Sequence, residues 1–167
     1  RMERTTVEIA SPDAQVGLRA TGQVILFDGF LRVYDQGRDD AETARFTLSA
    51  ALPAAVAHGE FFLRYQPLVA LADGEVLGCE ALVRWRHPER GLVSPAVFIP
   101  LAEETGTIGA IGEWVLRQAC ADAARWPGDV AVAVNVSAKQ LATAKLVDAV
   151  RDSLDRSGLP ATRLEIE

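Results

Sequence analysis

Apolar and polar positions follow two different patterns along this chain, and the patterns predict two kinds of local structure. Over the first forty residues, short β-prone runs at 5–10, 17–21 and 23–27 are separated by turn residues such as those at 28–29. The polar stretch at 37–40, Gly-Arg-Asp-Asp, predicts a further turn and marks a candidate domain boundary. We therefore expect a short β-rich segment ahead of the main domain.

Beyond residue 40 the pattern alternates between helical and strand-like periods. Helices are predicted at 43–58, 95–104, 108–126 and about 139–156, with Pro53 expected to kink or restart the first of them. Strands are predicted at 61–65, 68–71, 76–85, 130–134 and from 164 onward, with a hairpin turn at 72–74. Residues 130–134 are continuously apolar, which is typical of a strand covered on both faces. The order hairpin, helix, strand, helix, strand predicts an α/β fold with a parallel sheet or a barrel segment.

Composition and charge narrow the class of protein. The 167 residues, 49% of them hydrophobic, suffice to build the core of one domain. A net charge of -6 argues against broad, sequence-independent nucleic-acid binding. No apolar stretch approaches the roughly 20 residues that cross a bilayer, and no secretory signal is present, so we expect a soluble, cytoplasmic protein without a membrane segment. Cys79 and Cys120 lack metal-ligand spacing, which favours two reduced thiols.

Three polar residues lie where predicted strands end, namely Glu80, Asn135 and Glu167. In parallel α/β folds the C-terminal ends of the strands converge, and functional sites form there. Carboxylate and amide oxygens are hard ligands that suit Mg²⁺ or Mn²⁺ better than zinc. The pattern therefore predicts a site at which a divalent ion activates water and neutralises phosphoryl oxygens.

Each of these three residues also has a structural interpretation. An asparagine at a strand end commonly forms a turn or caps a helix, so Asn135 fits either role. Glu80 fits a salt bridge with Arg84 or Arg86 as well as it fits a metal site. Glu167 shares its strand face with another glutamate two residues earlier, and one of the two can simply be solvated.

Other polar and aromatic residues are assigned structural roles. His87 lies in a polar turn, where a surface or packing role is favoured over that of a general base. The three tryptophans are more typical of a core than of platforms for a ligand. Ser137 is placed to cap the helix that follows Asn135.

Six short segments occur in a fixed order between about residue 44 and residue 167. They are Tyr-Gln-Pro at 65–67, Glu-Ala-Leu-Val-Arg-Trp at 80–85, His-Pro-Glu-Arg-Gly at 87–91, Phe-Ile-Pro-Leu-Ala-Glu-Glu-Thr-Gly at 98–106, Val-Asn-Val-Ser at 134–137 and Leu-Glu-Ile-Glu at 164–167. This series resembles the N-terminal half of an EAL domain, the cyclic di-GMP phosphodiesterase family. The resemblance implies a barrel of the TIM type, in which a divalent metal pair activates water to cut one phosphodiester of cyclic di-GMP and give linear pGpG.

The resemblance also assigns roles to individual residues. Glu80 and Asn135 would be metal ligands for Mg²⁺ or Mn²⁺, with Glu80 the catalytic residue. Glu167 matches the opening glutamate of the family's Glu-x-Thr-Glu segment and would be a third ligand. Gln66 and Arg84 would contact the dinucleotide, and the planar fork of an arginine suits pairing with a phosphate.

The resemblance covers only part of the family's barrel. The chain opens on Arg1 and stops at Glu167, and the family's Asp-Asp-Phe-Gly segment, its catalytic lysine and its later glutamate and glutamine motifs lie beyond that point. We therefore expect a truncated module of cyclic di-GMP signalling that is inactive alone. An open barrel exposes sheet edges, so self-association is also expected. A degenerate module that binds cyclic di-GMP or another protein is the alternative.

A second resemblance concerns the first forty residues. Residues 19–31, Arg-Ala-Thr-Gly-Gln-Val-Ile-Leu-Phe-Asp-Gly-Phe-Leu, together with Tyr34 and the stretch at 37–40, resemble an internal segment of bacterial type IA DNA topoisomerase. In that enzyme the segment is part of a β-rich arch and holds neither the nucleophilic tyrosine nor the acidic metal cluster. The chain would then divide into a topoisomerase-like segment at 1–40 and a truncated EAL domain at 41–167. A topoisomerase fragment is the second alternative.

Overall fold

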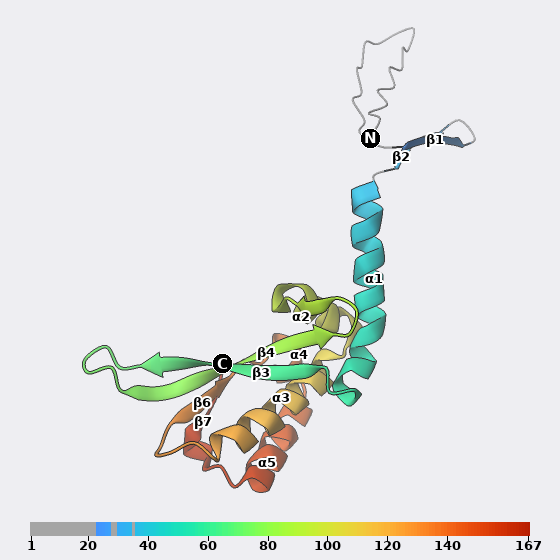
Figure 1. Cartoon of the computed structure of the whole chain (residues 1–167). Helices are drawn as coiled ribbons and strands as arrows, with labels where there is room; N and C mark the ends of the chain where they lie inside the picture. The colour runs from blue at the N-terminus through green and yellow to red at the C-terminus, as the bar shows by residue number, and fades with distance from the viewer. Residues whose placement is uncertain (1–22, 28–29, 35) are drawn as a thin grey trace. The chain divides into compact units, whose positions relative to one another are not determined.

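The structure, a computed structural model, describes the backbone of residues 23–27, 30–34 and 36–167, and the side chains from residue 43 onward. Two compact units are present, and the boundary between them lies between Thr47 and Leu48. Helix α1 (Gln36–Ala57) contains this boundary (Figure 1). None of the described helices combines the length and apolar character that crossing a bilayer requires.

The first unit contains a small antiparallel sheet. Strands β1 (Gln23–Phe27) and β2 (Phe30–Tyr34) pair along their whole length. This confirms the predicted strand at 23–27, whereas β2 was not predicted. The β-prone runs at 5–10 and 17–21 and the turn at 28–29 lie outside the described residues.

The turn predicted at 37–40 is wrong, because α1 begins at Gln36 and runs through this stretch. Two aspartates close to a helix N-terminus are favourable, since the helix dipole is positive there. The same polar residues therefore fit a first helical turn as well as they fit a loop. The domain boundary proposed near residue 40 stays a prediction.

The second unit is built on a five-stranded mixed sheet. Its strands are β3 (Phe61–Val69), β4 (Val76–His87), β5 (Gly91–Val93), β6 (Ala131–Val134) and β7 (Leu164–Ile166). The order is β3-β4-β6-β7, with β5 pairing to β4. The β3–β4 and β4–β5 pairs are antiparallel, whereas β4–β6 and β6–β7 are parallel. This confirms the predicted α/β class and agrees with a partial TIM-type barrel.

Strand β3 merges two strands that were predicted separately at 61–65 and 68–71. It runs through Pro67, which has no N–H to donate to a ladder. A proline is tolerated in an edge strand, and β3 is at the edge of the described sheet. Strand β5 was not predicted, since three residues give no readable alternation.

Five helical elements follow the β3–β4 hairpin or connect the parallel strands. They are α2 (Pro95–Thr105), α3 (Ile108–Ala123), α4 (Ala138–Leu141), α5 (Lys145–Ser157) and the 3₁₀ turn η1 (Ala161–Arg163). The single helix predicted at 139–156 is wrong, because it is divided into α4 and α5. The Thr143 hydroxyl donates to the Gln140 carbonyl at the break and so satisfies a helix-end acceptor. The restart predicted at Pro53 is also wrong, since α1 continues past this exposed residue, whereas the kink stays a prediction.

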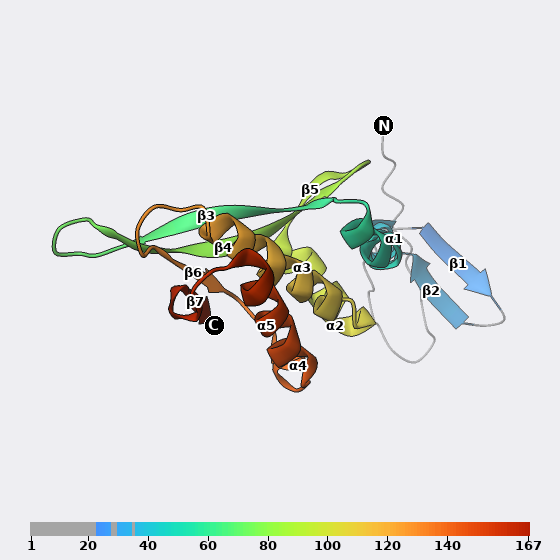
Figure 2. The ribbon, with the colours of Figure 1, turned by 90° about the horizontal axis from the view of Figure 1, so that it is seen from below.

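The core lies between the sheet and helices on one of its faces. Figures 1 and 2 show α3 and α5 on the same side of the sheet. Side chains that alternate along the strands pack there against the end of α1 and against α2, α3 and α5. The strand residues in this cluster are Phe61, Leu63, Tyr65, Ala81, Val83, Trp85, Val132, Val134 and Leu164. The predicted core role of the tryptophans is confirmed, with Trp85 fully buried and the other two packed against the cluster.

Polar cross-links fix the C-terminal end of α3 to the sheet. The Tyr65 hydroxyl donates to Asp122 Oδ2 at 2.7 Å, and Gln118 Nε2 donates to the other oxygen of the same carboxylate at 3.0 Å. The Arg163 guanidinium donates to the carbonyl oxygens of Ala123 and Val130. The Tyr65 bond ties the last turn of α3 to β3, and the Arg163 bonds tie it to the segment that enters β6, whereas the Gln118 bond lies within α3.

We expect the second unit to lose stability as the pH rises above about 9. Burial raises the pKa of the Cys120 thiol from its ordinary value of 9.0 to about 11. Burial, and then the hydrogen bond to Asp122, raise the pKa of the Tyr65 hydroxyl above its ordinary value of 10.0. Both groups ionise more readily in the unfolded chain, so their stabilisation is complete below their unfolded pKa values and is lost as pH rises through the folded ones. Urea unfolding at about pH 8 and about pH 11 measures the difference.

A variant without these two groups is the control for this alkaline loss of stability. Tyr65→Phe combined with Cys120→Ala is expected to show a smaller fall in unfolding free energy between the two pH values. An undiminished fall in the double variant would mean that other groups cause it.

Candidate functional site

The face of the sheet opposite the core carries most of the predicted site. Gln66 on β3 pairs with Glu80 on β4, which in turn pairs with Ala133 on β6. Residues paired in this way point to the same side of a sheet, and side chains two apart along a strand do so as well. We call this side the polar face and define it by Arg64, Gln66, Glu80, Arg84, Arg86 and Glu165. Its neighbours in sequence, such as Tyr65 and Trp85, point into the core.

The structure brings Glu80 and Asn135 into direct contact. Asn135 follows the last residue of β6, and its Nδ2 atom donates a hydrogen bond to Glu80 Oε1 at 2.7 Å. The predicted convergence of these two side chains is therefore confirmed. Among the described residues, no ion pair involves Glu80.

The arginines offered as alternative partners of Glu80 contact other groups. Arg84 Nη1 donates to the carbonyl oxygen of Val83 at 2.9 Å. The guanidinium of Arg86 lies 5.0 Å from the centre of the Phe62 ring, which is a cation–π distance. The salt-bridge interpretation of Glu80 is therefore wrong in this structure.

Glu80 does not lie at a strand end, which corrects the expectation from sequence. Strand β4 continues for seven more residues to His87, because its second half pairs with β3 and β5. What ends beside Glu80 is the parallel pairing, since β6 stops at Val134 opposite Ala81. The convergence arises at the end of β6 and in the middle of β4.

Glu167 is held beside Asn135 by its backbone. Its N–H donates to the Val134 carbonyl at 3.0 Å, and its own carbonyl accepts from the Val136 N–H at 2.8 Å. Its side chain is exposed. Within the described part of the chain, no cluster of three or more histidine, cysteine, aspartate or glutamate side chains has a geometry that could hold a metal ion. The pair that meets is thus Glu80 with Asn135.

Gln66 and Arg84 flank Glu80 on the polar face. Gln66 is the direct cross-strand neighbour of Glu80, and its side chain is exposed. Arg84 is four residues further along β4 on the same face and is half-buried. An amide therefore lies beside Glu80, and a guanidinium lies further along the same face of β4. Such groups can donate hydrogen bonds to the oxygens of an anionic ligand.

Comparison with known proteins identifies the family. The family model described as "EAL domain" matches residues 49–167. This chain belongs to the EAL domain family. The fold and the ordered motifs that pointed to this family are thereby explained by common descent.

Relatives of this EAL domain include proteins of cyclic di-GMP metabolism. Protein y4lL of Sinorhizobium fredii is 50% identical over 139 residues, which are 83% of this chain and 17% of that protein. The bifunctional diguanylate cyclase/cyclic di-GMP phosphodiesterase MucR of Pseudomonas aeruginosa is 46% identical over 120 residues, which are 70% of this chain and 18% of that protein. The chain thus spans less than a fifth of these relatives' length.

A solved structure supports the same relation. The PaMucR phosphodiesterase in complex with c-di-GMP matches with a TM-score of 0.69 and 44% sequence identity, over 72% of this chain and 50% of that one. The predicted relation to cyclic di-GMP phosphodiesterases is confirmed, and the chain spans about half of that solved domain's length.

The remaining site assignments concern residues beside the EAL motif. His87 is 6% exposed, its ring packs on Trp85 at 5.3 Å, and its Nδ1 atom accepts from the Glu89 N–H. Of the predicted surface or packing role, packing is confirmed, but His87 is the last residue of β4 and does not lie in the turn. Ser137 precedes α4 as expected, but its buried Oγ atom has no hydrogen-bond partner. Gln140 takes part in the same capping box, and its Oε1 atom accepts from the Ser137 N–H at 3.2 Å.

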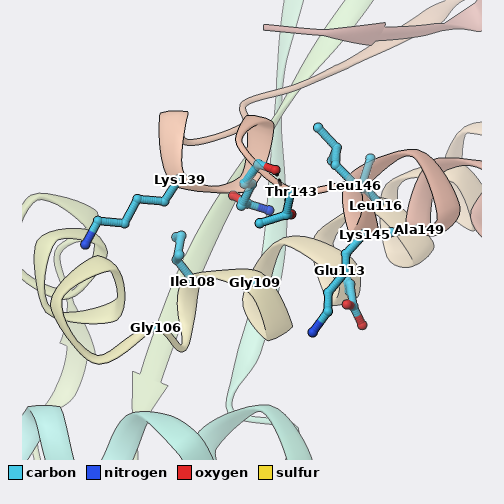
Figure 3. A pocket seen from close by; sticks show the side chains of 11 residues that line it. Gly106, Ile108, Gly109, Glu113, Leu116, Lys139, Thr143, Lys145, Leu146 and Ala149 are labelled. Atoms are coloured by element: carbon cyan, nitrogen blue, oxygen red, sulfur yellow. Dashed lines mark hydrogen bonds between the residues drawn. The ribbon is translucent and has the colours of Figure 1, made fainter.

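Gln140 is a residue that our sequence reasoning missed in this EAL domain. The spacing of a serine and a glutamine three residues later is the signal that could have found it, because it is the pattern of a capping box. Gln140 also lines a pocket of about 240 Å³ between α3, α4 and α5 (Figure 3). Gly109, Leu116 and Ala149 are among the residues that line this pocket, and none of the predicted site residues does.

Proposed function

We propose that the polar face of this EAL domain binds cyclic di-GMP together with a divalent cation, as part of a site that hydrolyses one phosphodiester to give linear pGpG. The observation that supports this proposal is the 2.7 Å contact between Glu80 and Asn135, which joins two oxygen-bearing side chains from different strands. The similarity to phosphodiesterases supports it independently.

The residues of the pair suit Mg²⁺ or Mn²⁺. Their hydrogen bond engages Asn135 Nδ2 and one oxygen of Glu80, and within the described residues neither Asn135 Oδ1 nor the second Glu80 oxygen accepts a hydrogen bond. Both remaining atoms are hard oxygen donors, as these cations prefer. We propose Glu80, Asn135 and Glu167 as the residues that hold the cation, and Glu80 as the catalytic one among them. A bound cation would polarise a phosphoryl oxygen and lower the pKa of a water molecule.

Gln66 and Arg84 are proposed to hold the dinucleotide. The guanidinium of Arg84 is suited to a phosphate because it can donate two parallel hydrogen bonds. Gln66 can donate to, or accept from, the polar edges of a base or ribose. Gln66 lies next to Glu80, and Arg84 lies four residues further along the same face of β4, so a ligand as long as a dinucleotide can contact both together with a cation.

Calorimetric titration of the chain with cyclic di-GMP tests the proposed function. We expect saturable heat in the presence of Mn²⁺ and a weaker response when the cation is removed by a chelator. Absence of heat at high micromolar ligand would contradict the proposal. Binding without formation of linear pGpG agrees with the expectation that this chain is inactive alone, whereas formation of pGpG would contradict that expectation.

Arg84→Ala is expected to weaken cyclic di-GMP binding by about 10- to 100-fold, since a hydrogen bond to a charged group contributes about 1.5–3 kcal/mol. The same calorimetric titration measures this change. Arg90→Ala is the matched control, because it removes the same charge from a residue that is exposed in the turn between β4 and β5. Equal losses in both variants would indicate a general effect of charge and would contradict the role of Arg84.

Two further expectations from the sequence stay predictions. Self-association is expected because β3 and β7 are edges of the described sheet, and edge strands can pair with another chain. Sedimentation velocity at several concentrations would detect it.

The resemblance of residues 1–40 to a topoisomerase segment lies outside the family match, which begins at residue 49. Relaxation of supercoiled DNA is the assay for that alternative, and we expect none.

A further inference from the structure

Helices α3 and α4 contact each other at a point where a side chain on α3 would collide with the Gln140 side chain. Gly112 lies in α3, and Gln140 lies in α4 and is 8% exposed. A Cβ atom added to Gly112 would lie 1.8 Å from Gln140 Nε2 and 2.8 Å from its Cδ atom. Atoms cannot approach this closely, so any larger residue at position 112 must displace the Gln140 side chain.

Gln140 in turn holds the segment that carries Asn135. Its Oε1 atom accepts from the Ser137 N–H at 3.2 Å, and its own N–H donates to the Ser137 carbonyl at 2.9 Å. Asn135 is two residues before Ser137, and its side chain reaches Glu80. The segment 135–137 is therefore held by Glu80 at one end, by the Glu167 carbonyl at Val136, and by Gln140 at the other end.

Gln140 supplies the side-chain acceptor for the Ser137 N–H in the capping box at the start of α4. Loss of the Gln140 amide would leave a backbone N–H without its acceptor at the start of a four-residue helix. That N–H would then need water or a shifted backbone as its partner.

We propose that Gln140, packed on Gly112, is a positioning residue that sets the place of the Asn135 amide next to Glu80. Its effect on cation affinity rests on the proposed function, whereas its effect on the position of Asn135 does not. Residues that orient a ligand of a metal typically change affinity by about 10- to 100-fold when altered.

The chain offers a probe that reports on this position directly. Asn135 is its only asparagine, so selective ¹⁵N-asparagine labelling gives one backbone amide signal and one pair of side-chain amide signals in an NMR spectrum. We expect Gly112→Ala to shift the side-chain pair relative to the unaltered chain. Gly109→Ala is the matched control in the same helix, because a Cβ atom there meets no atom within 4 Å, and it should leave the signals unchanged.

A second variant keeps the test valid if Gly112→Ala fails to fold. Gln140→Met preserves the length of the side chain and removes the acceptor for the Ser137 N–H, so it should shift the Asn135 signals as well. A purely structural role would lower the unfolding free energy of these variants and leave the Asn135 signals of the folded protein in place. That result in both variants would overturn the proposal.

Titration with Mn²⁺ separates this inference from the proposed function. Mn²⁺ is expected to broaden the Asn135 side-chain signals of the unaltered chain, and Gly112→Ala and Gln140→Met should need about tenfold more cation for the same effect. No broadening in the unaltered chain would contradict the proposed function. The Asn135 side-chain signals would still test the positioning role, because they should shift in Gly112→Ala and stay unchanged in Gly109→Ala.

Discussion

Glu80→Gln is expected to weaken Mn²⁺ binding by roughly 100-fold or more, since it removes the negative charge from a cation site with few carboxylates. The exchange keeps the side-chain length and an Oε1 atom that can still accept from Asn135 Nδ2, so the 2.7 Å contact can persist. Loss of affinity can therefore be assigned to charge, with the local structure preserved. Calorimetric titration with Mn²⁺ measures the cation affinity, and a second titration with cyclic di-GMP measures the ligand affinity.

Glu89→Gln controls for the change in net charge. Glu89 is exposed in the turn that joins β4 to β5, so its neutralisation should leave the Mn²⁺ affinity within about twofold, as expected for screened surface charges. If Glu80→Gln bound Mn²⁺ as tightly as Glu89→Gln, Glu80 would not be a ligand. The interpretation of the polar face as a cation site would then have to be abandoned.

The parts of the site that the sequence predicts are those set by neighbouring strands. The apolar run at 130–134 indicates a covered strand, and this alone places Asn135 at the end of β6. Parallel pairing with β4 then brings Glu80 beside it. What the pattern cannot show is that β4 continues to His87, because its second half is set by antiparallel partners on either side.

The parts that the sequence does not predict depend on contacts between elements distant in the chain. Gly112 looks like an ordinary weak point of a helix until Gln140 is seen packed against it. Ser137 looks like a helix cap, yet its hydroxyl is unused and the glutamine three residues later supplies the acceptor. Polar residues fit a turn and a helix end equally well, so local polarity alone does not locate helix boundaries. For this reason the start of α1 at 37–40 and the break between α4 and α5 were not predicted.

Trp85→Ala is expected to destabilise the second unit by about 3–5 kcal/mol, the range for removing a large buried aromatic residue. Its side chain is fully buried, and its ring lies 5.8 Å from each of the rings of Phe61 and Phe98. Its Nε1 atom donates to Glu60 Oε2 at 2.9 Å, so the change also leaves this carboxylate without that donor. Thermal unfolding followed by near-ultraviolet circular dichroism should show a melting temperature lower by roughly 10 °C.

The side of the sheet on which Trp85 lies makes this prediction informative about the site. Trp85 points into the core, whereas Glu80 on the same strand points to the polar face, so the change removes packing and no ligand. Mn²⁺ affinity, measured well below the melting temperature, should therefore fall far less in Trp85→Ala than in Glu80→Gln. Leu92→Ala is the stability control, since Leu92 is 63% exposed and its loss should cost less than about 0.5 kcal/mol. A Trp85→Ala chain that kept its stability would show that the aromatic cluster does not anchor β4 to the helices.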